Sequence, residues 1–175
     1  ANYKSLMGVG EAQLKIETSL IDSMIDFRMD GVILIAPRIS GKQLERFATQ
    51  IPMVVVGHHE ASSQTFDTVN SNDIEGAKLA VNALIEAGHR DIHMISLPHR
   101  PHSEIDVYNQ REIGYLAAMQ EAGLKAKVLR SNEKSPAKED ELRTILANRS
   151  ASAYFCWSDI HAVALYGVAS AAGVR

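Results

Sequence analysis

The chain has 175 residues, of which 46% are apolar and 22% are charged, and its formal net charge is −3 at pH 7. This balance is typical of a globular protein that buries one sizeable core or two smaller ones, and it argues against disorder. The negative charge supplies no basic surface for a phosphate backbone, so we do not expect the chain by itself to bind nucleic acid.

The chain contains one cysteine, Cys156, which excludes an internal disulfide framework. No apolar run approaches the roughly 20 residues that cross a bilayer, and no basic-then-apolar signal peptide opens the chain. We therefore expect no membrane contact. A cytoplasmic protein is the simpler interpretation, although a mature secreted chain would also lack its signal peptide.

The first part of the chain alternates between strand and helix patterns. Hydrophobic periodicity predicts strands at residues 3–9, 31–35 and 53–56, a short extended piece at 66–69, and helices at 11–27 and from 40 onward. The second helix begins with the capping-box spacing of Ser40 and Gln43, and Pro52 ends it.

Residues 72–95 are the most informative stretch, because they read as a helix, a stop and a strand. Asn72 suits an N-cap, and Glu75 stands three positions later, as in a capping box. Gly88 lies where a left-handed C-terminal residue is expected, and two cationic residues follow it beside the last carbonyls. Residues 91–95 then alternate as a half-buried strand would.

The rest of the chain repeats this unit. The pattern predicts a helix at residues 109–121, a strand at 127–129, a helix with Ser135 as its cap and Pro136 in its first position, a strand at 153–157, and a last helix that Ser158 or Asp159 caps and Gly173 stops. Strands that alternate with amphipathic helices predict the α/β fold class, with parallel sheets covered on both faces. In such sheets ligands bind beyond the carboxyl ends of the strands.

Three motifs suggest other chemistry, and each has a simpler explanation. Gly8-Val9-Gly10 resembles a dinucleotide-binding loop, but Gln13 stands where the third glycine should be. The histidines at 58–59 and within 99–102 suggest a metal, yet adjacent histidines on a strand cannot face one ion, and no set with ligand spacing accompanies them. Cys156 has no obvious base nearby, so we interpret it as a packed small side chain. We therefore expect no cofactor and no metal.

Arg111 and Asp159 fit a ligand site better, because each lies near the N-terminal turn of a helix that follows a strand. Arginine offers a rigid fork for hydroxyls or a carboxylate, and aspartate accepts from hydroxyls. Asp159 also has a structural explanation, since a carboxylate is favourable in a first helical turn. Arg111 has a weaker one, because a cation in such a turn is unfavourable.

Six segments occur in an order and at spacings that resemble one known family. They are Asp30–Leu34, Ile51–Val56, Val69–Asp73, Leu84–Ile95 with its Gly88-His89-Arg90, Arg111–Tyr115 and Ser158–Ala162. Together, over essentially the whole chain, they resemble the effector-binding core of the lactose-repressor and galactose-repressor (LacI/GalR) family of bacterial transcription regulators.

The resemblance implies a fold like that of periplasmic sugar-binding proteins, with two α/β lobes hinged around a small ligand. Residues 1–69 would form the N-terminal lobe and residues 70–175 the C-terminal lobe. By the same likeness, the first strand and helix of the N-terminal lobe and the end of the C-terminal lobe would lie outside the chain. Since that strand would be central, we expect an isolated chain to be unstable or to borrow strands from a partner.

The resemblance also implies a set of effector-binding residues beyond strand ends. These residues are Arg111, Ser158, Asp159, Asn132, His58 and Leu97. Arg111 matches the family's ligand-gripping cation, Ser158 stands where an asparagine commonly contacts the ligand, and Asn132 falls near a position that often holds an aromatic ring. The family usually carries an Asp-Arg pair where this chain has Gly57-His58, which allows an effector other than the common hexoses.

The function that the resemblance implies is effector sensing in a cytoplasmic homodimer. A small molecule, a sugar or a related metabolite, would close the lobes and shift operator DNA binding by a helix-turn-helix domain that is not in this chain. The alternative is a periplasmic sugar-binding protein of a transporter, and the sequence upstream would separate the two. We do not expect an enzyme, because no nucleophile and base can be assembled.

Overall fold

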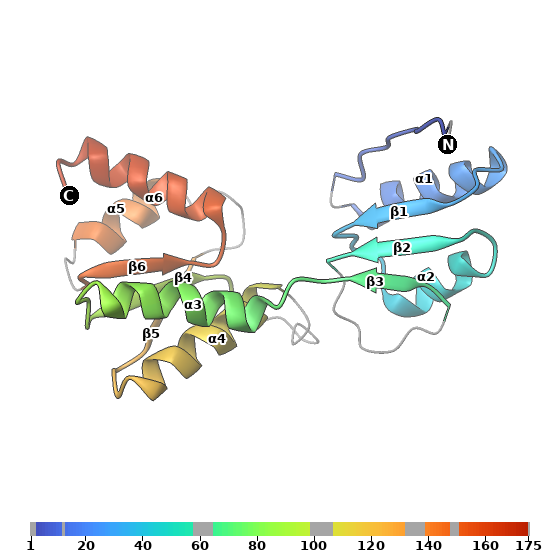
Figure 1. The fold of residues 1–175 in the computed structure, drawn as a ribbon. Coiled ribbons are helices and arrows are strands. Elements are labelled where there is room, and N and C mark those ends of the chain that lie inside the picture. Colours follow the sequence, from blue (N-terminus) through green and yellow to red (C-terminus); the bar gives the residue numbers. More distant parts are fainter. Residues whose placement is uncertain are drawn as a thin grey trace. The chain divides into compact units, whose positions relative to one another are not determined.

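The computed structural model describes residues 3–11, 13–57, 65–98, 107–131, 139–147 and 151–174. The chain divides into two compact units, Ala1–Ser71 and Asn72–Arg175, and each contains a three-stranded parallel sheet with helices packed on it (Figure 1). The expected α/β fold with parallel sheets is therefore confirmed. No helix in the described ranges is both long enough and apolar enough to cross a membrane.

The first unit follows the predicted alternation of helix and strand. Its elements are α1 (Leu14–Asp26), β1 (Val32–Ile35), α2 (Gly41–Ala48), β2 (Met53–Val56) and β3 (Asp67–Val69). The strands lie in the order β1-β2-β3. Helix α2 begins as its sequence predicts, since the side-chain oxygen of Gln43 accepts from the backbone amide of Ser40 at 3.4 Å.

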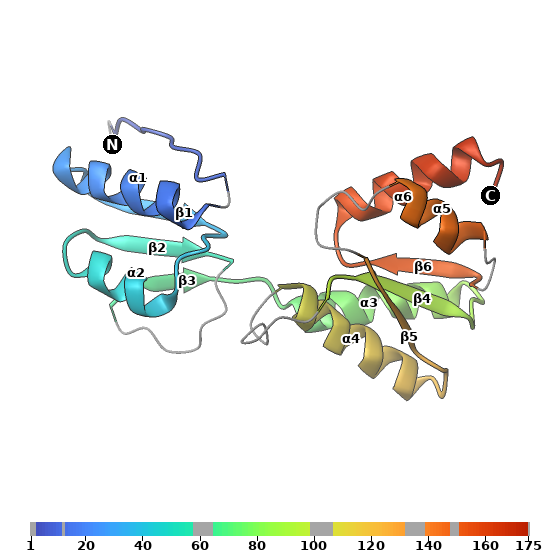
Figure 2. The same ribbon diagram turned by 180° about the vertical axis from the view of Figure 1, so that it is seen from behind.

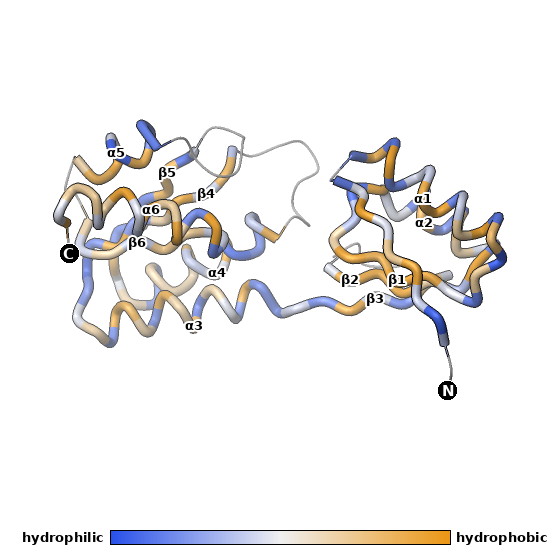
Figure 3. The backbone as a smooth tube through the Cα atoms, turned by 90° about the horizontal axis from the view of Figure 1, so that it is seen from above, coloured by the Kyte–Doolittle hydropathy of each residue, from blue (hydrophilic) through white to orange (hydrophobic). Residues whose placement is uncertain are grey.

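Helices α1 and α2 pack on the same face of the first sheet (Figure 3). Ile21 of α1 and Leu44 of α2 belong to one core with Val55 of β2. Side chains alternate along a strand, so Ile33 and Ile35 point to the opposite face, where they are 70% and 77% exposed. The prediction that both faces are covered is therefore wrong for this sheet within the described residues.

The predicted first strand does not form. Residues 3–10 contain no strand, and the side chains of Tyr3 and Met7 are 81% and 90% exposed. A strand requires a neighbour to accept its hydrogen bonds, and β1 pairs only with β2 among the described strands. An alternating pattern alone could not supply that partner. The following helix also begins later than predicted, at Leu14.

The second unit is a sheet covered on both faces. Its elements are α3 (Asp73–Glu86), β4 (Ile92–Ser96), α4 (Val107–Glu121), β5 (Lys127–Arg130), α5 (Glu139–Ala147), β6 (Ala153–Cys156) and α6 (Asp159–Ala171). The strand order is β5-β4-β6, with both pairs parallel. Helices α3 and α4 lie on one face, and α5 and α6 lie on the other (Figure 2).

Strand β4 is more deeply buried than the sequence predicts. All five of its residues are buried, although the alternation of residues 91–95 predicts a half-buried strand. The polar residue in the pattern, His93, is only 2% exposed, and its Nε2 lies 3.0 Å from a carboxylate oxygen of Asp91. A central strand with helices on both faces has no solvated side, so a neighbouring side chain instead of water pairs with Nε2. The other ring nitrogen, Nδ1, is buried without a hydrogen-bond partner among the described residues.

The structure confirms the start and the end that the sequence predicts for α3. The side chain of Asn72 accepts from the amide of Glu75 at 3.1 Å, as an N-cap does. Gly88 has φ +97°, and the amide of the next residue, His89, donates to the carbonyl of Leu84 at 3.1 Å. These contacts form a Schellman motif. The motif ends the helix and directs the chain into β4.

Helices α3 and α4 meet at a glycine. A Cβ atom on Gly114 of α4 would overlap the carbonyl oxygen of Ile74 and lie 2.8 Å from the Cβ of Ala77, both on α3. Only a residue without a side chain permits this approach. The contact brings the N-terminal half of α4 against the start of α3, which places Arg111 beside Asp73.

Candidate functional site

The candidate site lies at the carboxyl end of the second sheet. Strands β4, β5 and β6 end at Ser96, Arg130 and Cys156, and the helices α4 and α6 begin beyond this end of the sheet. We call the residues that follow these strands, together with the first turns of α3, α4 and α6, the carboxyl end of the second sheet. Parallel α/β sheets bind their ligands there.

Arg111 of α4 is held at this end by two partners. Its Nε donates to a carboxylate oxygen of Asp73, in the first turn of α3, at 3.0 Å, and its Nη1 donates to the carbonyl of Trp157 at 2.7 Å. The side chain of Asp73 is 3% exposed, and that of Arg111 is 35% exposed. The guanidinium therefore has a fixed orientation and remains partly accessible. Arg111 thus has a structural role that is stronger than its sequence position indicated.

Ser158 and Asp159 form the start of α6. The Ser158 hydroxyl accepts from the amide of His161 at 3.5 Å and lies 2.8 Å from Nδ1 of the same residue. A carboxylate oxygen of Asp159 accepts from the amide of Ile160 at 2.9 Å, and its side chain is exposed. Both side chains therefore serve the helix terminus. Ser158 directly follows Trp157, whose carbonyl holds Arg111.

A second arginine lies at the same end of the sheet. Nη1 of Arg130 donates to the carbonyl of Leu97 at 3.1 Å, and its two terminal nitrogens donate to the two carboxylate oxygens of Glu112. The side chain of Glu112 is 8% exposed and that of Arg130 is 31% exposed. This two-pronged ion pair joins α4 to the ends of β4 and β5. Leu97, a predicted site residue, takes part through its backbone.

Aromatic rings pack beside these groups. The indole of Trp157 lies 5.2 Å from the imidazole of His161 and 6.0 Å from the ring of Tyr108, measured between centroids. Burial lowers the pKa of His161 below its ordinary 6.5, and the charge of Glu141 opposes that shift. Burial therefore favours the neutral imidazole.

Cys156 is confirmed as a packed side chain. It lies against the core that α5 and α6 form with the sheet. Burial raises the pKa of its thiol to about 11, so it carries little thiolate at neutral pH. A nucleophilic role does not fit this environment.

Two predicted site residues, His58 and Asn132, lie outside the described residues, as do the histidines within 99–102 and the predicted cap at Ser135. Within the described ranges, no three His, Cys, Asp or Glu side chains gather as metal ligands.

Sequence reasoning missed the two buried carboxylates and the second arginine. Asp73 pairs with Arg111 across 38 residues, and Glu112 pairs with Arg130 across 18 residues. An acidic residue in the first turn of a helix is already explained by its interaction with the helix dipole, so the sequence position of Asp73 does not indicate an ion pair. The one indication of this pairing in the sequence is the place of Arg111 near a helix start, where a cation is unfavourable unless a nearby anion compensates its charge.

Known proteins match this chain as follows. Residues 81–175 match the family of periplasmic binding protein-like domains. The chain is similar to the HTH-type transcriptional repressor PurR of Actinobacillus pleuropneumoniae, with 31% identity over 165 residues, which cover 91% of this chain and 47% of that repressor. It spans about half the length of the curated relatives that it matches.

Two solved structures show the same fold. A regulatory protein of LacI family from Chloroflexus aggregans has a TM-score of 0.71 and 25% identity, covering 96% of this chain and 59% of that one. A LacI family transcriptional regulator from Enterococcus faecium with bound ribose has a TM-score of 0.73 and 19% identity, covering 90% of this chain and 58% of that one. The chain therefore belongs to the family of periplasmic-binding-protein-like domains and, within it, to the effector-binding cores of LacI/GalR regulators.

Proposed function

We propose that this chain is the effector-sensing part of a cytoplasmic, DNA-binding transcription regulator, and that it binds a small polar molecule such as a sugar. One observation carries the proposal: two partners hold Arg111 at the carboxyl end of the second sheet, where α/β sheets bind ligands. The relatives support it, since the curated ones are named as HTH-type repressors and one similar structure contains ribose.

In this proposal the two compact units, Ala1–Ser71 and Asn72–Arg175, correspond to the lobes of the effector-binding core that we expect at residues 1–69 and 70–175. The second lobe contributes the effector contacts Arg111, Ser158, Asp159, Asn132 and Leu97. His58 remains a predicted contact of the first lobe. The regulator acts as a homodimer, binds operator DNA through helix-turn-helix domains and catalyses no reaction.

A solute-binding protein of a transporter is the second candidate, because the matched family is named for periplasmic binding proteins. The curated relatives favour the regulator, since they are named as repressors. The sequence upstream of Ala1 in the gene separates the two candidates: a helix-turn-helix supports the regulator, and a signal peptide supports the transporter.

The functional test uses the full-length regulator that carries this chain. Sugars, polyols and nucleobases are screened by thermal shift, and each hit is titrated by calorimetry. The hit is then added to a complex of the protein with DNA selected in vitro, because an effector must change the affinity for DNA if the two sites are coupled. Tight binding of a ligand that leaves DNA affinity unchanged would contradict the regulatory role.

A further inference from the structure

The imidazole of His161 lies against the hydroxyl of Ser158 at the start of α6. Nδ1 of the ring is 2.8 Å from the Ser158 oxygen, and the backbone amide of His161 donates to the same oxygen at 3.5 Å. The His161 side chain is completely buried, and its second nitrogen, Nε2, has no hydrogen-bond partner among the described residues. Within the described structure, the ring therefore makes its hydrogen bond to Ser158 alone.

The protonation state of the ring decides which atom donates in this contact. A neutral imidazole has one nitrogen that donates and one that accepts, whereas an imidazolium donates from both. If Nδ1 accepts, the Ser158 hydroxyl donates to the ring and accepts from the amide, so it makes one bond of each kind. If Nδ1 carries a proton, two donors converge on the Ser158 oxygen, and its hydroxyl proton needs another acceptor. The contacts of Ser158 therefore favour the neutral ring with Nδ1 as acceptor.

The groups around His161 also favour the neutral ring. Burial lowers the pKa of His161, and the charge of Glu141, on α5, opposes that shift without reversing it. The side chains of Tyr154 and Cys156, on β6, stay neutral at pH 7 because burial raises their pKa values. Asp159, in the same helical turn, is exposed to water, which screens its charge. The imidazole is therefore predominantly neutral at pH 7.

Ser158 lies at the end of the sheet where parallel α/β proteins bind ligands. It stands two residues after the end of β6, and its side chain is only partly buried. The carbonyl of the preceding residue, Trp157, accepts from Arg111 at 2.7 Å. A hydroxyl that has donated its proton to His161 offers a ligand only its remaining lone pair. Towards a ligand, Ser158 then accepts a hydrogen bond and does not donate one.

Building on the effector-sensing function proposed above, we infer that His161 is a positioning residue for the effector. The neutral ring holds the Ser158 hydroxyl proton, so that Ser158 presents an acceptor to a donor group of the effector. A proton on Nδ1 takes that lone pair and turns the Ser158 hydroxyl into a donor. Effector binding is therefore linked to pH: the affinity is highest with the neutral ring and falls as His161 takes up a proton.

The first test needs no effector. Nuclear magnetic resonance follows the titration of His161 in the full-length regulator with isotope-labelled histidine, and H161N identifies the signal by its loss. The nitrogen shifts show which nitrogen of the neutral ring carries the proton, and we expect Nε2. A hydroxyl that donates to Nδ1 stabilises the neutral ring, so we expect S158A to raise the midpoint of the titration by about half a pH unit or more.

S158T and S170A are the matched controls. S158T keeps a hydroxyl at the same position, and Ser170 is an exposed serine of the same helix. We expect both variants to leave the midpoint unchanged. A neutral ring protonated at Nδ1 would overturn the inference, and so would a midpoint that S158A lowers or leaves unchanged. The proton position is measured in wild type, so it remains decisive if S158A does not fold.

The second test measures binding by calorimetry at pH 7.5 and pH 5.0. D-ribose, D-glucose, myo-inositol and adenine represent the sugars, polyols and nucleobases of the screen. For a compound that binds, we expect the affinity of wild type to fall about threefold to tenfold at the lower pH, as the loss of one hydrogen bond predicts. The side-chain amide that H161N introduces has an oxygen that accepts from Ser158 and does not titrate, so we expect its affinity to stay constant.

Equal pH dependence of the affinity in wild type and H161N would overturn the link between His161 and the effector. Failure of the proposed function gives a different result. In that case no compound of the screen binds at either pH, while the effect of S158A on the titration of His161 persists.

Discussion

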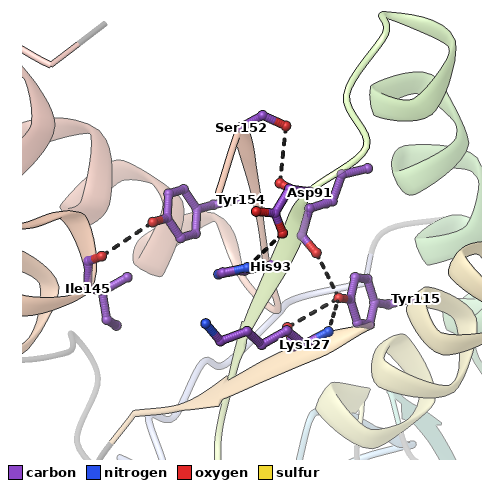
Figure 4. A network of polar contacts seen from close by, with 8 residues as sticks. Asp91, His93, Tyr115, Lys127, Ile145, Ser152 and Tyr154 are labelled. Carbon is purple, nitrogen blue, oxygen red and sulfur yellow. Dashed lines mark hydrogen bonds and ion pairs between the residues drawn. The ribbon is translucent and has the colours of Figure 1, made fainter. Parts of the chain in front are cut away.

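The hydroxyl of Tyr115 accepts a hydrogen bond from the backbone amide of Lys127 at 2.8 Å, and it donates to the carbonyl of Ile92 at 2.8 Å (Figure 4). Lys127 and Ile92 are the first residues of β5 and β4. The hydroxyl thus joins two neighbouring strands at the amino end of the second sheet. Burial raises the pKa of Tyr115, so the hydroxyl keeps its proton.

We expect Y115F to lower the free energy of unfolding by about 1–3 kcal/mol, because it leaves buried backbone groups without this partner. Urea denaturation followed by circular dichroism measures the change. Y166F is the matched control, since Tyr166 of α6 is 76% exposed. A loss for Y115F no larger than that for Y166F would show that water or another group replaces the hydroxyl.

A methyl group at Gly114 should separate α3 from α4. Its Cβ would overlap the carbonyl oxygen of Ile74, which is backbone and cannot move aside alone. We expect G114A to cost about 3 kcal/mol or more. G76A on α3 is the control, because a Cβ there would meet no atom within 4 Å and alanine favours a helix over glycine by about 1 kcal/mol. Thermal melts of the two variants should therefore shift in opposite directions.

Replacement of Arg111 should affect both binding and stability. R111A removes charged hydrogen bonds to an effector, which would weaken its affinity by about 1.5–3 kcal/mol. The same change takes from the buried carboxylate of Asp73 its bond to Nε, so we also expect unfolding to become easier by about 2 kcal/mol. Calorimetry and denaturation on one preparation separate the two effects. Unchanged affinity with reduced stability would assign Arg111 a structural role only.

The second unit should lose stability below about pH 6.5 through His161. Burial lowers the pKa of this residue in the folded protein, so the unfolded chain takes up the proton at a higher pH than the folded one. The contribution to the free energy of unfolding is therefore complete above the unfolded pKa and decreases as the pH falls through it toward the folded pKa. Denaturation curves from pH 7.5 to 5.5 should show a steeper loss for wild type than for H161Q. Parallel pH profiles would rule out this contribution.

Local signals in the sequence predicted the elements well. The cap at Asn72 and the stop at Gly88 depend on contacts within a few residues, so α3 was predictable at both ends. The strand predicted at residues 3–9 failed because a strand depends on a neighbour that the pattern does not name. The pairing of Glu112 with Arg130 could not be predicted either, because the sequence does not show which distant residues the fold brings together. Arg111 was selected for its place near the start of a helix that follows a strand and then for its family match, and the structure adds the partners that hold it.

The hydrogen bonds of Tyr115 lie at the amino end of the second sheet, and the paired arginines lie at its carboxyl end. Substitutions at one end therefore need not disturb the other, because the length of the strands separates them. A lineage could change what Arg111 and its neighbours recognise while the bonds that keep the strands aligned stay intact. The same separation gives protein engineers a practical order of work: strengthen the amino end first, and then vary the carboxyl end for a new ligand.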